Sequence, residues 1–238
     1  MKQRLDKTLV NLGLVPTRSQ AASYIKLGQV TVNNNVVAKP GFLVGEADEV
    51  RLKSTEQYVS RAGLKLASVA QAFKLEFRDK IVLDVGSSTG GFTDYALRHG
   101  AKKVIAVDVG TDQLHPSLRA DGRVELHEKT DIRDFKTKEV IDIVVADLSF
   151  ISLREILPTV SSIIPGEAEI VAMVKPQFEG RDSSLRHKGV IKNEHLRRDI
   201  LKDFESWAKQ TFAIVDKADS QVAGAKGNRE RFYLLRKV

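Results

Sequence analysis

The sequence predicts an α/β fold, with a mostly parallel sheet whose last strand is antiparallel, preceded by a small α+β domain. After residue 60, short apolar runs alternate with helical or loop segments, and strands that are apolar on both faces are typical of a parallel sheet covered on both sides. The first 50 residues instead contain two short helical patterns and a hairpin pattern. We therefore expect domains at residues 1–52 and 60–238, joined by a polar linker at residues 53–59.

Length and composition narrow the class of protein. The 238 residues are 42% hydrophobic and 29% charged, which allows packed cores and argues against global disorder. The absence of cysteine excludes disulfides, thiolate zinc sites and cysteine nucleophiles, and the five histidines show no spacing typical of metal ligands. There is neither a signal-peptide pattern nor an apolar run of the roughly 18–20 residues that span a bilayer. We expect a cytoplasmic protein with no metal and no membrane partner, and the net charge of +7 weakly favours a polyanionic partner.

The first 52 residues contain the elements of a small domain. Apolar positions Leu5, Leu9 and Leu12 predict a helix that Gly13 can end. A second helix begins at a cap, Thr17 or Ser19, and ends at Gly28. The remaining elements expected here are a strand at 29–33, a turn at 33–35, a return strand from Val36 and a short strand at 50–52.

The rest of the chain begins with a helix whose apolar stripe contains Leu66 and Phe73. The strands expected after it are 81–85, 104–107, 124–126, 141–146, 170–174, 212–215 and 232–235. The last two lie close together in sequence with a polar loop between them, which favours an antiparallel pair that closes the sheet.

A turn rich in Gly, Ser and Thr follows the first of these strands and leads into a helix. Small residues let a ligand approach the backbone, and a helix N-terminus offers unpaired N–H groups. Asp84 suits a cationic amino group, and Asp108, at the end of the next strand, suits ribose hydroxyls. Asp131 is either a contact for an adenine amine or a solvated loop acid. The dinucleotide fingerprint fits poorly because Ser88 replaces its second glycine, so we expect another nucleoside-containing cofactor. The candidate contacts are Asp84, Gly86, Ser87, Ser88, Thr89, Gly90, Gly91, Phe92, Asp108, Asp131 and Asp147.

Four segments resemble a known family. The motifs DVGSSTGGFT (84–93), ADLSFISL (146–153), VKPQFE (174–179) and GNRE (227–230) are similar to those of TlyA-type ribosomal RNA methyltransferases, relatives of the FtsJ-type ribose 2′-O-methyltransferases. Residues 1–50 resemble an RNA-binding domain first described in a small-subunit ribosomal protein. The similarity covers nearly the whole chain and implies a Rossmann-like methyltransferase sheet behind an RNA-binding domain.

The resemblance also implies a reaction and its residues. S-adenosylmethionine would be the cofactor, ribosomal RNA or a ribosomal subunit the partner, and a cytidine 2′-hydroxyl the acceptor. The implied catalytic tetrad is Lys65, Asp147, Lys175 and Glu230, and the expected RNA contacts are Arg4, Arg18, Ser19, Gln20 and Lys26. We expect Lys175 to act either as a neutral general base or as a fixed positive charge. Two departures from the family, Ala62 and the segment 180–189, lie outside the tetrad.

Four other classes of protein are weighed against this interpretation. A noncatalytic RNA-binding or ribosome assembly factor would lack the tetrad, whose four residues are present here. A pseudouridine synthase needs an aspartate in an Arg-Leu-Asp context, and Arg4-Leu5-Asp6 lies within the RNA-binding part. A membrane-active hemolysin would need an apolar or amphipathic membrane segment that is missing. An NAD-dependent oxidoreductase would need the glycine fingerprint that Ser88 breaks.

Overall fold

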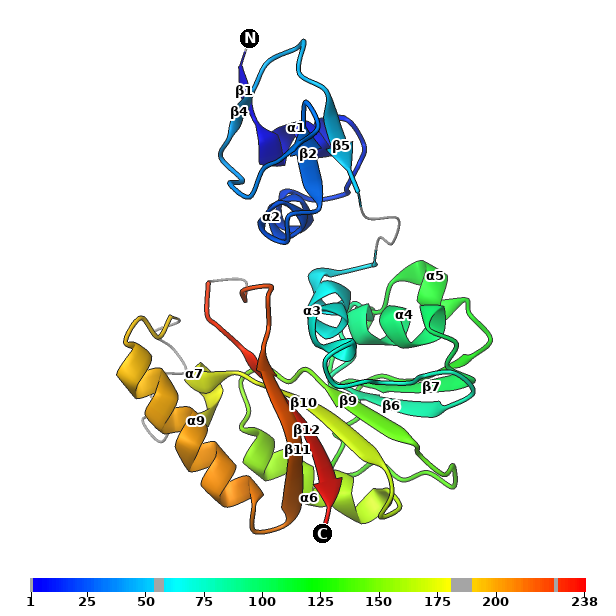
Figure 1. Ribbon diagram of the computed structural model, residues 1–238. Helices are drawn as coiled ribbons and strands as arrows, with labels where there is room; N and C mark the ends of the chain where they lie inside the picture. Colours follow the sequence, from blue (N-terminus) through cyan, green and yellow to red (C-terminus); the bar gives the residue numbers. More distant parts are fainter. Residues whose placement is uncertain (1, 54–57, 181–189, 225–226) are drawn as a thin grey trace.

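A seven-stranded sheet forms the centre of the larger part of the chain (Figure 1). The computed structural model describes residues 2–53, 58–180, 190–224 and 227–238. The sheet order is β11-β12-β10-β9-β6-β7-β8, and only β12 runs antiparallel to its neighbours. This confirms the predicted fold class. The strands are β6 (Ile81–Val85), β7 (Lys103–Val107), β8 (Val124–His127), β9 (Ile143–Ala146), β10 (Glu169–Val174), β11 (Phe212–Asp219) and β12 (Arg231–Lys237).

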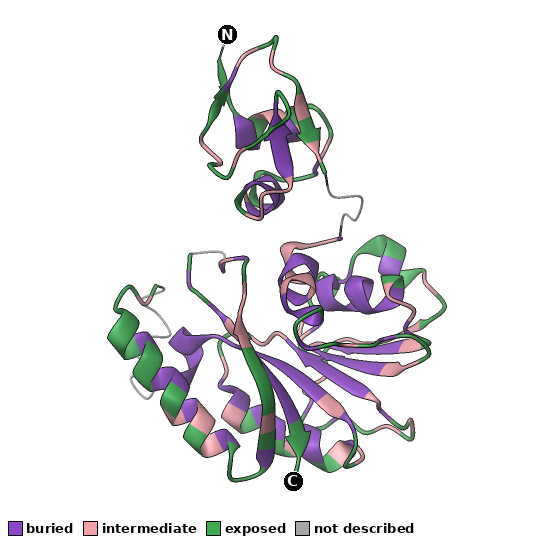
Figure 2. Cartoon of the chain, in the orientation of Figure 1, coloured by how far each residue is buried: buried purple, intermediate pink, exposed green. Residues whose placement is uncertain are grey.

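Helices cover both faces of this sheet. They are α3 (Arg61–Ala70), α4 (Gly91–Arg98), α5 (Pro116–Arg119), α6 (Leu153–Ile163), α7 (Pro176–Glu179) and α9 (Glu194–Ala208). Alternate strand residues point to opposite faces, so Val82 and Val104 pack with α3 and α4 while Leu83 and Ile105 pack with α6 and α9. The central strands are therefore buried on both sides, as Figure 2 shows.

The connections create a crevice at one edge of the sheet. From β6 the chain moves outward through β7 to β8, and it then crosses back to place β9 on the other side of β6. Ligands of open α/β sheets bind where the strand order reverses, beyond the carboxyl ends of the strands. The ends of β6 and β9 therefore mark the expected position of the functional site.

The N-terminal part forms two small sheets around two helices. Its elements are β1 (Gln3–Arg4), α1 (Leu5–Asn11), α2 (Arg18–Lys26), β2 (Val30–Val32), β3 (Asn35–Val36), β4 (Leu43–Val44) and β5 (Val50–Leu52). Strands β3-β2-β5 form one antiparallel sheet, and β1 pairs with β4. Thr17, one of the two predicted caps, accepts a hydrogen bond from the backbone N–H of Gln20 at the start of α2. Asn33 and Asn34 turn the hairpin with positive φ angles of 49° and 64°.

Two expectations for this region are corrected. Leu12 does not lie on the buried stripe, because α1 ends at Asn11 and Leu12 is exposed. Residues 53–59 are not simply a polar linker, since Tyr58 is buried and Val59 N–H donates to Asp94 Oδ2 at 2.8 Å. Residues 54–57 and 181–189 lie outside the described residues, and so do the predictions that fall on them, including those for most of the segment 180–189.

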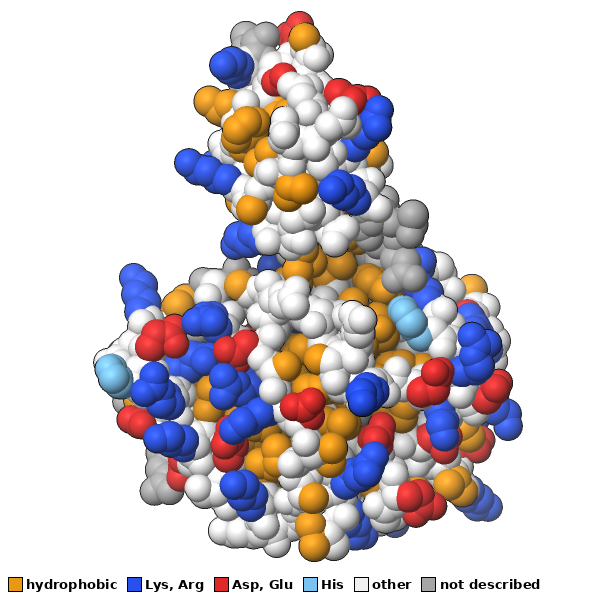
Figure 3. All heavy atoms as spheres, viewed as in Figure 1, with side chains coloured by type: hydrophobic (Ala, Val, Ile, Leu, Met, Phe, Trp, Pro, Cys, Tyr) orange, Lys and Arg blue, Asp and Glu red, His pale blue; other side chains and the backbone are white. Residues whose placement is uncertain are grey.

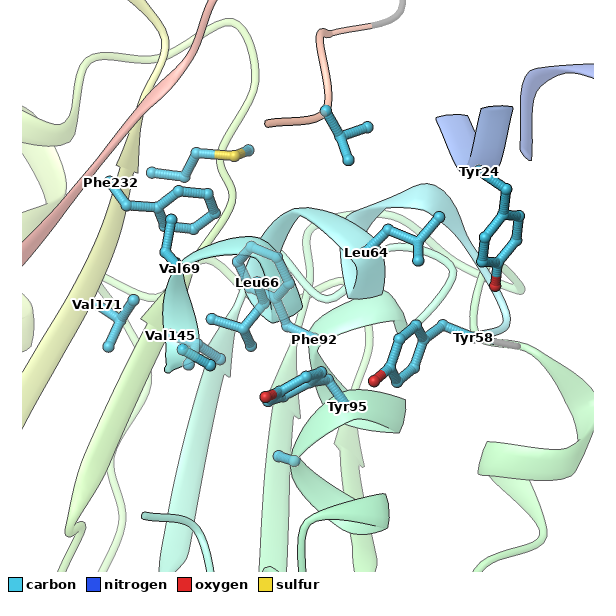
Figure 4. Packing of buried hydrophobic residues seen from close by; sticks show 14 of the residues in the cluster. Tyr24, Tyr58, Leu64, Leu66, Val69, Phe92, Tyr95, Val145, Val171 and Phe232 are labelled. Atoms are coloured by element: carbon cyan, nitrogen blue, oxygen red, sulfur yellow. The ribbon is translucent and has the colours of Figure 1, made fainter. Parts of the chain in front are cut away.

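The two parts of the chain pack against each other through α2 and α3. Tyr24 of α2 points toward Tyr58 and Leu64 (Figure 4), and the three residues belong to one buried hydrophobic cluster. Gln20 of α2 donates a hydrogen bond from Nε2 to the backbone oxygen of Tyr58 at 3.1 Å. This contact fixes the N-terminal part next to the helix that carries Lys65.

Helices α3 and α4 approach closely at Gly91. A Cβ atom at this position would lie 2.6 Å from the Ala62 Cβ and 2.8 Å from the backbone nitrogen of Gly63. These distances are far below a normal contact, and a backbone atom cannot move aside as a flexible side chain would. Glycine at this position therefore allows α3 to lie against the turn that follows β6.

We predict that Gly91→Ala destabilises the protein by about 1–3 kcal/mol, the usual cost of overpacking. Helix propensity alone predicts the opposite sign, because alanine is the better helix former. The matched control is Gly166→Ala, since a Cβ there meets nothing within 4 Å. Thermal unfolding of both variants without cofactor tests this, and an unchanged or higher midpoint for Gly91→Ala would contradict the packing argument.

Candidate active site

Four predicted site residues meet at the carboxyl edge of the sheet. Asp84 is the fourth residue of β6, Asp147 directly follows β9, and Lys175 directly follows β10. Parallel neighbours end at the same edge, which brings these three side chains close together. Glu230 directly precedes β12, and because β12 is antiparallel its first residue lies at this edge too.

Two buried ion pairs join the predicted tetrad. Lys175 Nζ lies 2.6 Å from Asp147 Oδ1 and donates a hydrogen bond to Ser149 Oγ at 2.7 Å. Lys65 Nζ, on α3, lies 2.6 Å from Glu230 Oε2. Both lysine side chains are less than a tenth exposed, so each charge depends on its partner.

Two cavities open at this edge and meet beside Asp147. The larger, of about 540 Å³, extends from the end of β6 past the end of β7 to the loop after β8. The smaller, of about 240 Å³, lies between α3 and the strand ends and is lined by both tetrad lysines. Gly86, Ser88, Asp147 and Ser149 line both cavities, so molecules bound in the two cavities would touch there.

The structure places nearly all of the predicted cofactor contacts on these cavities. Gly86, Ser88, Asp108, Asp131 and Asp147 line the larger one. The smaller one is lined by Asp84, Gly86, Ser87, Ser88, Thr89, Gly91, Phe92 and Asp147. Gly90 lines neither cavity; it caps α4 with a φ of 92°.

Two backbone N–H groups, one in the glycine-rich turn and one in the loop after β7, hold Asp108 in a fixed orientation. Ser88 N–H donates to Asp108 Oδ2 at 2.8 Å, and Gly110 N–H donates to Oδ1 at 2.7 Å. Gly86 has a φ of 81°, and a Cβ there would lie 2.9 Å from the Leu148 side chain. Glycine is thus required where the end of β6 meets the loop after β9.

Asp84 has an unpaired buried oxygen. The residue is 1% exposed, and Thr93 Oγ1 donates to its Oδ2 at 2.6 Å. Oδ1 has no hydrogen-bond partner among the described residues. Burial is the main cause that raises the pKa of Asp84 to about 7; the charges of Asp147 and Asp108 act in the same direction, and the Thr93 hydroxyl opposes the shift. Such an oxygen suits a cationic donor, which would satisfy it and favour its ionised form.

Asp131 borders the larger cavity with its carboxylate held by Arg133. The Arg133 backbone N–H and Nε donate to Oδ1 at 2.9 Å each, and Nη2 donates to Oδ2 at 2.6 Å. These hydrogen bonds lower the pKa of Asp131, so the group is ionised at neutral pH. Asp131 is therefore an ordered acid on the cavity wall.

Sequence reasoning missed three residues of the site, Ser149, Phe150 and Glu179. Ser149 shares the Lys175 ammonium with Asp147. Phe150 lines the larger cavity, is 77% exposed and has a φ of 69°. Both lie within the motif ADLSFISL, but nothing in the motif indicates which side chain faces the cavity.

Glu179 connects the two loops that carry the Lys175–Asp147 pair. Its carboxylate accepts hydrogen bonds from Ser152 Oγ at 2.6 Å and from Leu153 N–H at 2.7 Å. Those donors lie at the start of α6, which follows Asp147, while Glu179 ends α7, which follows Lys175. The two loops are thereby fastened to each other below the site.

Of the five predicted RNA contacts in the N-terminal part, four are exposed and one is buried. Asp6 is buried and accepts hydrogen bonds from Arg4 and Arg18, whose guanidinium groups remain about half exposed; these bonds lower the pKa of Asp6 to about 2. Ser19 and Lys26 are exposed on α2. Gln20 is buried and bonded to Tyr58, which corrects its expected place on the RNA-facing surface, because its amide is used to join the two parts.

Comparison with known protein families matches both parts of the chain. The model of the FtsJ-like methyltransferase family matches residues 58–237, and the S4 domain model matches residues 3–50. The chain belongs to the FtsJ-like methyltransferase family. The seven-stranded sheet and the site at its carboxyl edge belong to the methyltransferase region of this FtsJ-like methyltransferase. Helices α1 and α2 belong to the S4 domain.

Relatives resemble this methyltransferase along nearly its whole length. A candidate rRNA methyltransferase of Bacillus subtilis, YqxC, is 41% identical over 96% of this chain and 84% of its own length. The 16S/23S rRNA (cytidine-2′-O)-methyltransferase TlyA of Mycobacterium tuberculosis is 37% identical over 99% of this chain and 90% of its own. A solved structure from Streptococcus thermophilus, described as a candidate hemolysin, is 36% identical with a TM-score of 0.73 and covers 100% of this chain and 89% of that one.

Family membership argues against two of the alternative classes of protein. The methyltransferase match over most of the chain leaves no region for a pseudouridine synthase or an NAD-dependent oxidoreductase. Asp6, the aspartate that a synthase would need, is held between two arginines. Across the described ranges, no helix is both long and apolar enough to cross a bilayer. The same ranges hold no cluster of three or more His, Cys, Asp or Glu side chains arranged for a metal ion.

The raised pKa of Asp84 predicts a pH-dependent effect of Asp84→Asn. A carboxyl with a pKa near 4 in the unfolded chain and about 7 in the folded one stabilises the fold at low pH, and this contribution disappears as pH rises from about 4 through 7. Asparagine does not ionise, so the variant shows no such decline. We expect its stability relative to the original to improve by about 1–2 kcal/mol between pH 5.5 and pH 8. Thermal unfolding without cofactor at both pH values measures it, and a difference that does not change with pH would mean that Asp84 ionises normally.

Proposed function

We propose that this protein transfers a methyl group from S-adenosylmethionine to the ribose 2′-hydroxyl of a cytidine in ribosomal RNA. The observation that carries the proposal is the position of the Lys175–Asp147 pair, at the place where a cofactor-sized cavity meets a smaller one. The proposed acceptor follows the name of one relative, which is a 16S/23S rRNA (cytidine-2′-O)-methyltransferase. A ribosomal RNA substrate supports a location in the cytoplasm.

The larger cavity fits S-adenosylmethionine by size and by charge. Its volume of about 540 Å³ lies within the usual range for small-molecule sites. Asp108, Asp131 and Asp147 line it, and the unpaired Asp84 Oδ1 lies at the adjoining strand end. Acids at these positions suit a ligand that carries both an ammonium and a sulfonium group.

Each of these acids has a distinct role in the proposal. Asp84 would hold the amino group, because its Oδ1 is the one buried carboxylate oxygen among the described residues that neither a hydrogen bond nor a lysine satisfies. Asp108 would accept from the ribose hydroxyls, since the backbone N–H groups of Ser88 and Gly110 already orient its two oxygens. Asp131 would face the adenine amine, with Arg133 holding it in place.

When bound, S-adenosylmethionine supplies an electrophilic methyl group. The protein must then orient the ribose hydroxyl and accept its proton. Asp147 and Ser149, which line both cavities, hold Lys175 Nζ beside the place where the two cavities meet. We assign Lys175 as the general base, which acts in its neutral form after its ammonium proton has been released to solvent. Asp147 would then stabilise the positive charge that Lys175 regains with the ribose proton.

The second ion pair positions the substrate. Lys65 lines the smaller cavity, and Glu230 holds its ammonium at 2.6 Å. Lys65 and Glu230 would orient the ribose. Phe150, exposed at the mouth of the larger cavity, offers a ring face on which an unstacked base can lie. Arg4, Arg18, Ser19 and Lys26 of the S4 domain would contact the RNA backbone.

Two substitutions of Lys175 test the proposal. Lys175→Ala should lower methyl transfer to ribosomal RNA by at least ~10²-fold, the scale of losing a general base, while cofactor affinity changes little. Lys175→Arg should not restore the rate, because a guanidinium does not give up its proton at working pH. The measurement is transfer of labelled methyl from S-adenosylmethionine, with Lys209→Ala, an exposed lysine after α9, as the matched control.

The pair of variants separates the two roles of Lys175. Recovery of most of the rate in Lys175→Arg would identify Lys175 as a fixed positive charge. Near-normal turnover of both variants would remove the tetrad from catalysis.

A further inference from the structure

A groove separates the S4 domain from the methyltransferase region next to the proposed active site. It has a volume of about 330 Å³ and lies between α2, the start of α3 and the loop that precedes β12. We call it the interdomain groove and define it by Ser19, Ser23 and Lys26 of α2 and Arg61 of α3. Figure 1 shows α2 lying over α3 and over the described part of the β11–β12 loop, and in Figure 3 lysine and arginine side chains lie near the junction of the two parts.

Arg61 connects this groove to the active site. The same residue lines the interdomain groove and the smaller cavity that holds both tetrad lysines. Arg61 and Lys65 lie four residues apart on α3, which places them on one side of the helix, about 6 Å apart along its axis. A chain that passes Lys65 can therefore continue past Arg61 into the groove.

The charges along this path favour an anion. Lys65 and Lys175 are each neutralised by an acid, whereas Arg61 and Lys26 form no ion pair with any described residue. None of the described residues that line the groove is acidic. Glu230 lies behind Gly224 at the groove wall, but it is 3% exposed and paired with Lys65.

The proposed substrate has an anion at the corresponding position. The carbon that bears a ribose 2′-hydroxyl adjoins the carbon that bears the 3′-phosphate, so a nucleotide placed for methylation brings a phosphodiester next to the active site. We propose that Arg61 binds the phosphate that adjoins the methylated ribose, and that Lys26 binds the RNA backbone further along the interdomain groove. This rests on the proposed function, and it makes the S4 domain a wall of the substrate path beside the active site.

Buried contacts between the two parts fix the geometry of the groove. Gln20 and Tyr24 of α2 are fixed against Tyr58 and Leu64. These contacts hold Lys26, which lies on the same helix, at a defined position relative to Arg61. The phosphate path is therefore present before RNA binds, with a smaller ordering cost on binding.

Binding of a short, single-stranded, fluorescein-labelled oligocytidylate to the full chain tests the groove. Anisotropy titrations over a salt series give the slope of log K against log[salt], whose magnitude falls by about 0.7 for each phosphate of a single strand that the protein no longer binds. Arg61→Ala and Lys26→Ala should each lower the slope by about 0.7, and the double variant by about 1.4. Lys102→Ala, an exposed lysine before β7 at the opposite edge of the sheet, should leave it unchanged.

A second oligocytidylate with uncharged methylphosphonate linkages shows whether phosphate is the group recognised. The original protein and the double variant should bind this oligonucleotide with the same slope. Arg61→Ala should also raise the KM for ribosomal RNA more than it lowers kcat, because an interaction made in both the ground and transition states affects mainly KM. Its affinity for S-adenosylmethionine should not change.

An unchanged slope in the double variant, or an equal fall in Lys102→Ala, would overturn the phosphate path. Displacement of the oligocytidylate by an oligoglutamate peptide from the original protein, but not from the double variant, would also overturn it in favour of an acidic protein partner. Failure of the proposed function would look different from failure of the phosphate path. The original protein would then transfer no methyl group to ribosomal RNA, whatever salt slopes the variants give.

Discussion

The ion pair between Lys175 and Asp147 is the constraint on which the arrangement of the site depends. Two charges with so little exposure are tolerated only when they are paired, and the pairing requires β9 and β10 to be parallel neighbours that end at the same edge of the sheet. In the register that pairs Ala172 with Ala146, Asp147 follows β9 directly, and β10 continues for two more residues before Lys175 follows it at the same edge. The meeting point of the two cavities lies beside the same pair.

Buried contacts outside the two cavities hold this arrangement in place. Glu179 fastens the loop after β10 to the start of α6, so the two halves of the ion pair move together. On the other side, Gly91 lets α3 approach the turn after β6, which brings Lys65 within 2.6 Å of Glu230. The site is thus assembled from four strand ends and one helix, each held by contacts that lie outside the cavities. The S4 domain extends this arrangement through α2, which packs on α3.

The fold could largely be predicted because each buried strand leaves a local signal. The run Ile81–Val85 is apolar except for Asp84, and an acid within such a run, followed by a glycine-rich turn, indicates a site from the sequence alone. Asp147 and Lys175 were likewise predictable as charges that end apolar strands. The burial of Tyr58 and Gln20, the exposure of Phe150 and the capping by Glu179 were not, since each depends on a partner distant in sequence. Leu12 failed for the opposite reason: its helical spacing is real, but the helix ends one residue earlier.

The most direct test of the account is a map of ribose methylation in ribosomal RNA from cells with and without this protein. The account predicts a 2′-O-methylcytidine that is absent without the protein, returns with the original chain, and does not return with Lys175→Ala. An identical map in both cells, or the disappearance of a methyl group carried by a base rather than by a ribose oxygen, would contradict the assignment of Lys175, Asp147, Lys65 and Glu230 to ribose methylation.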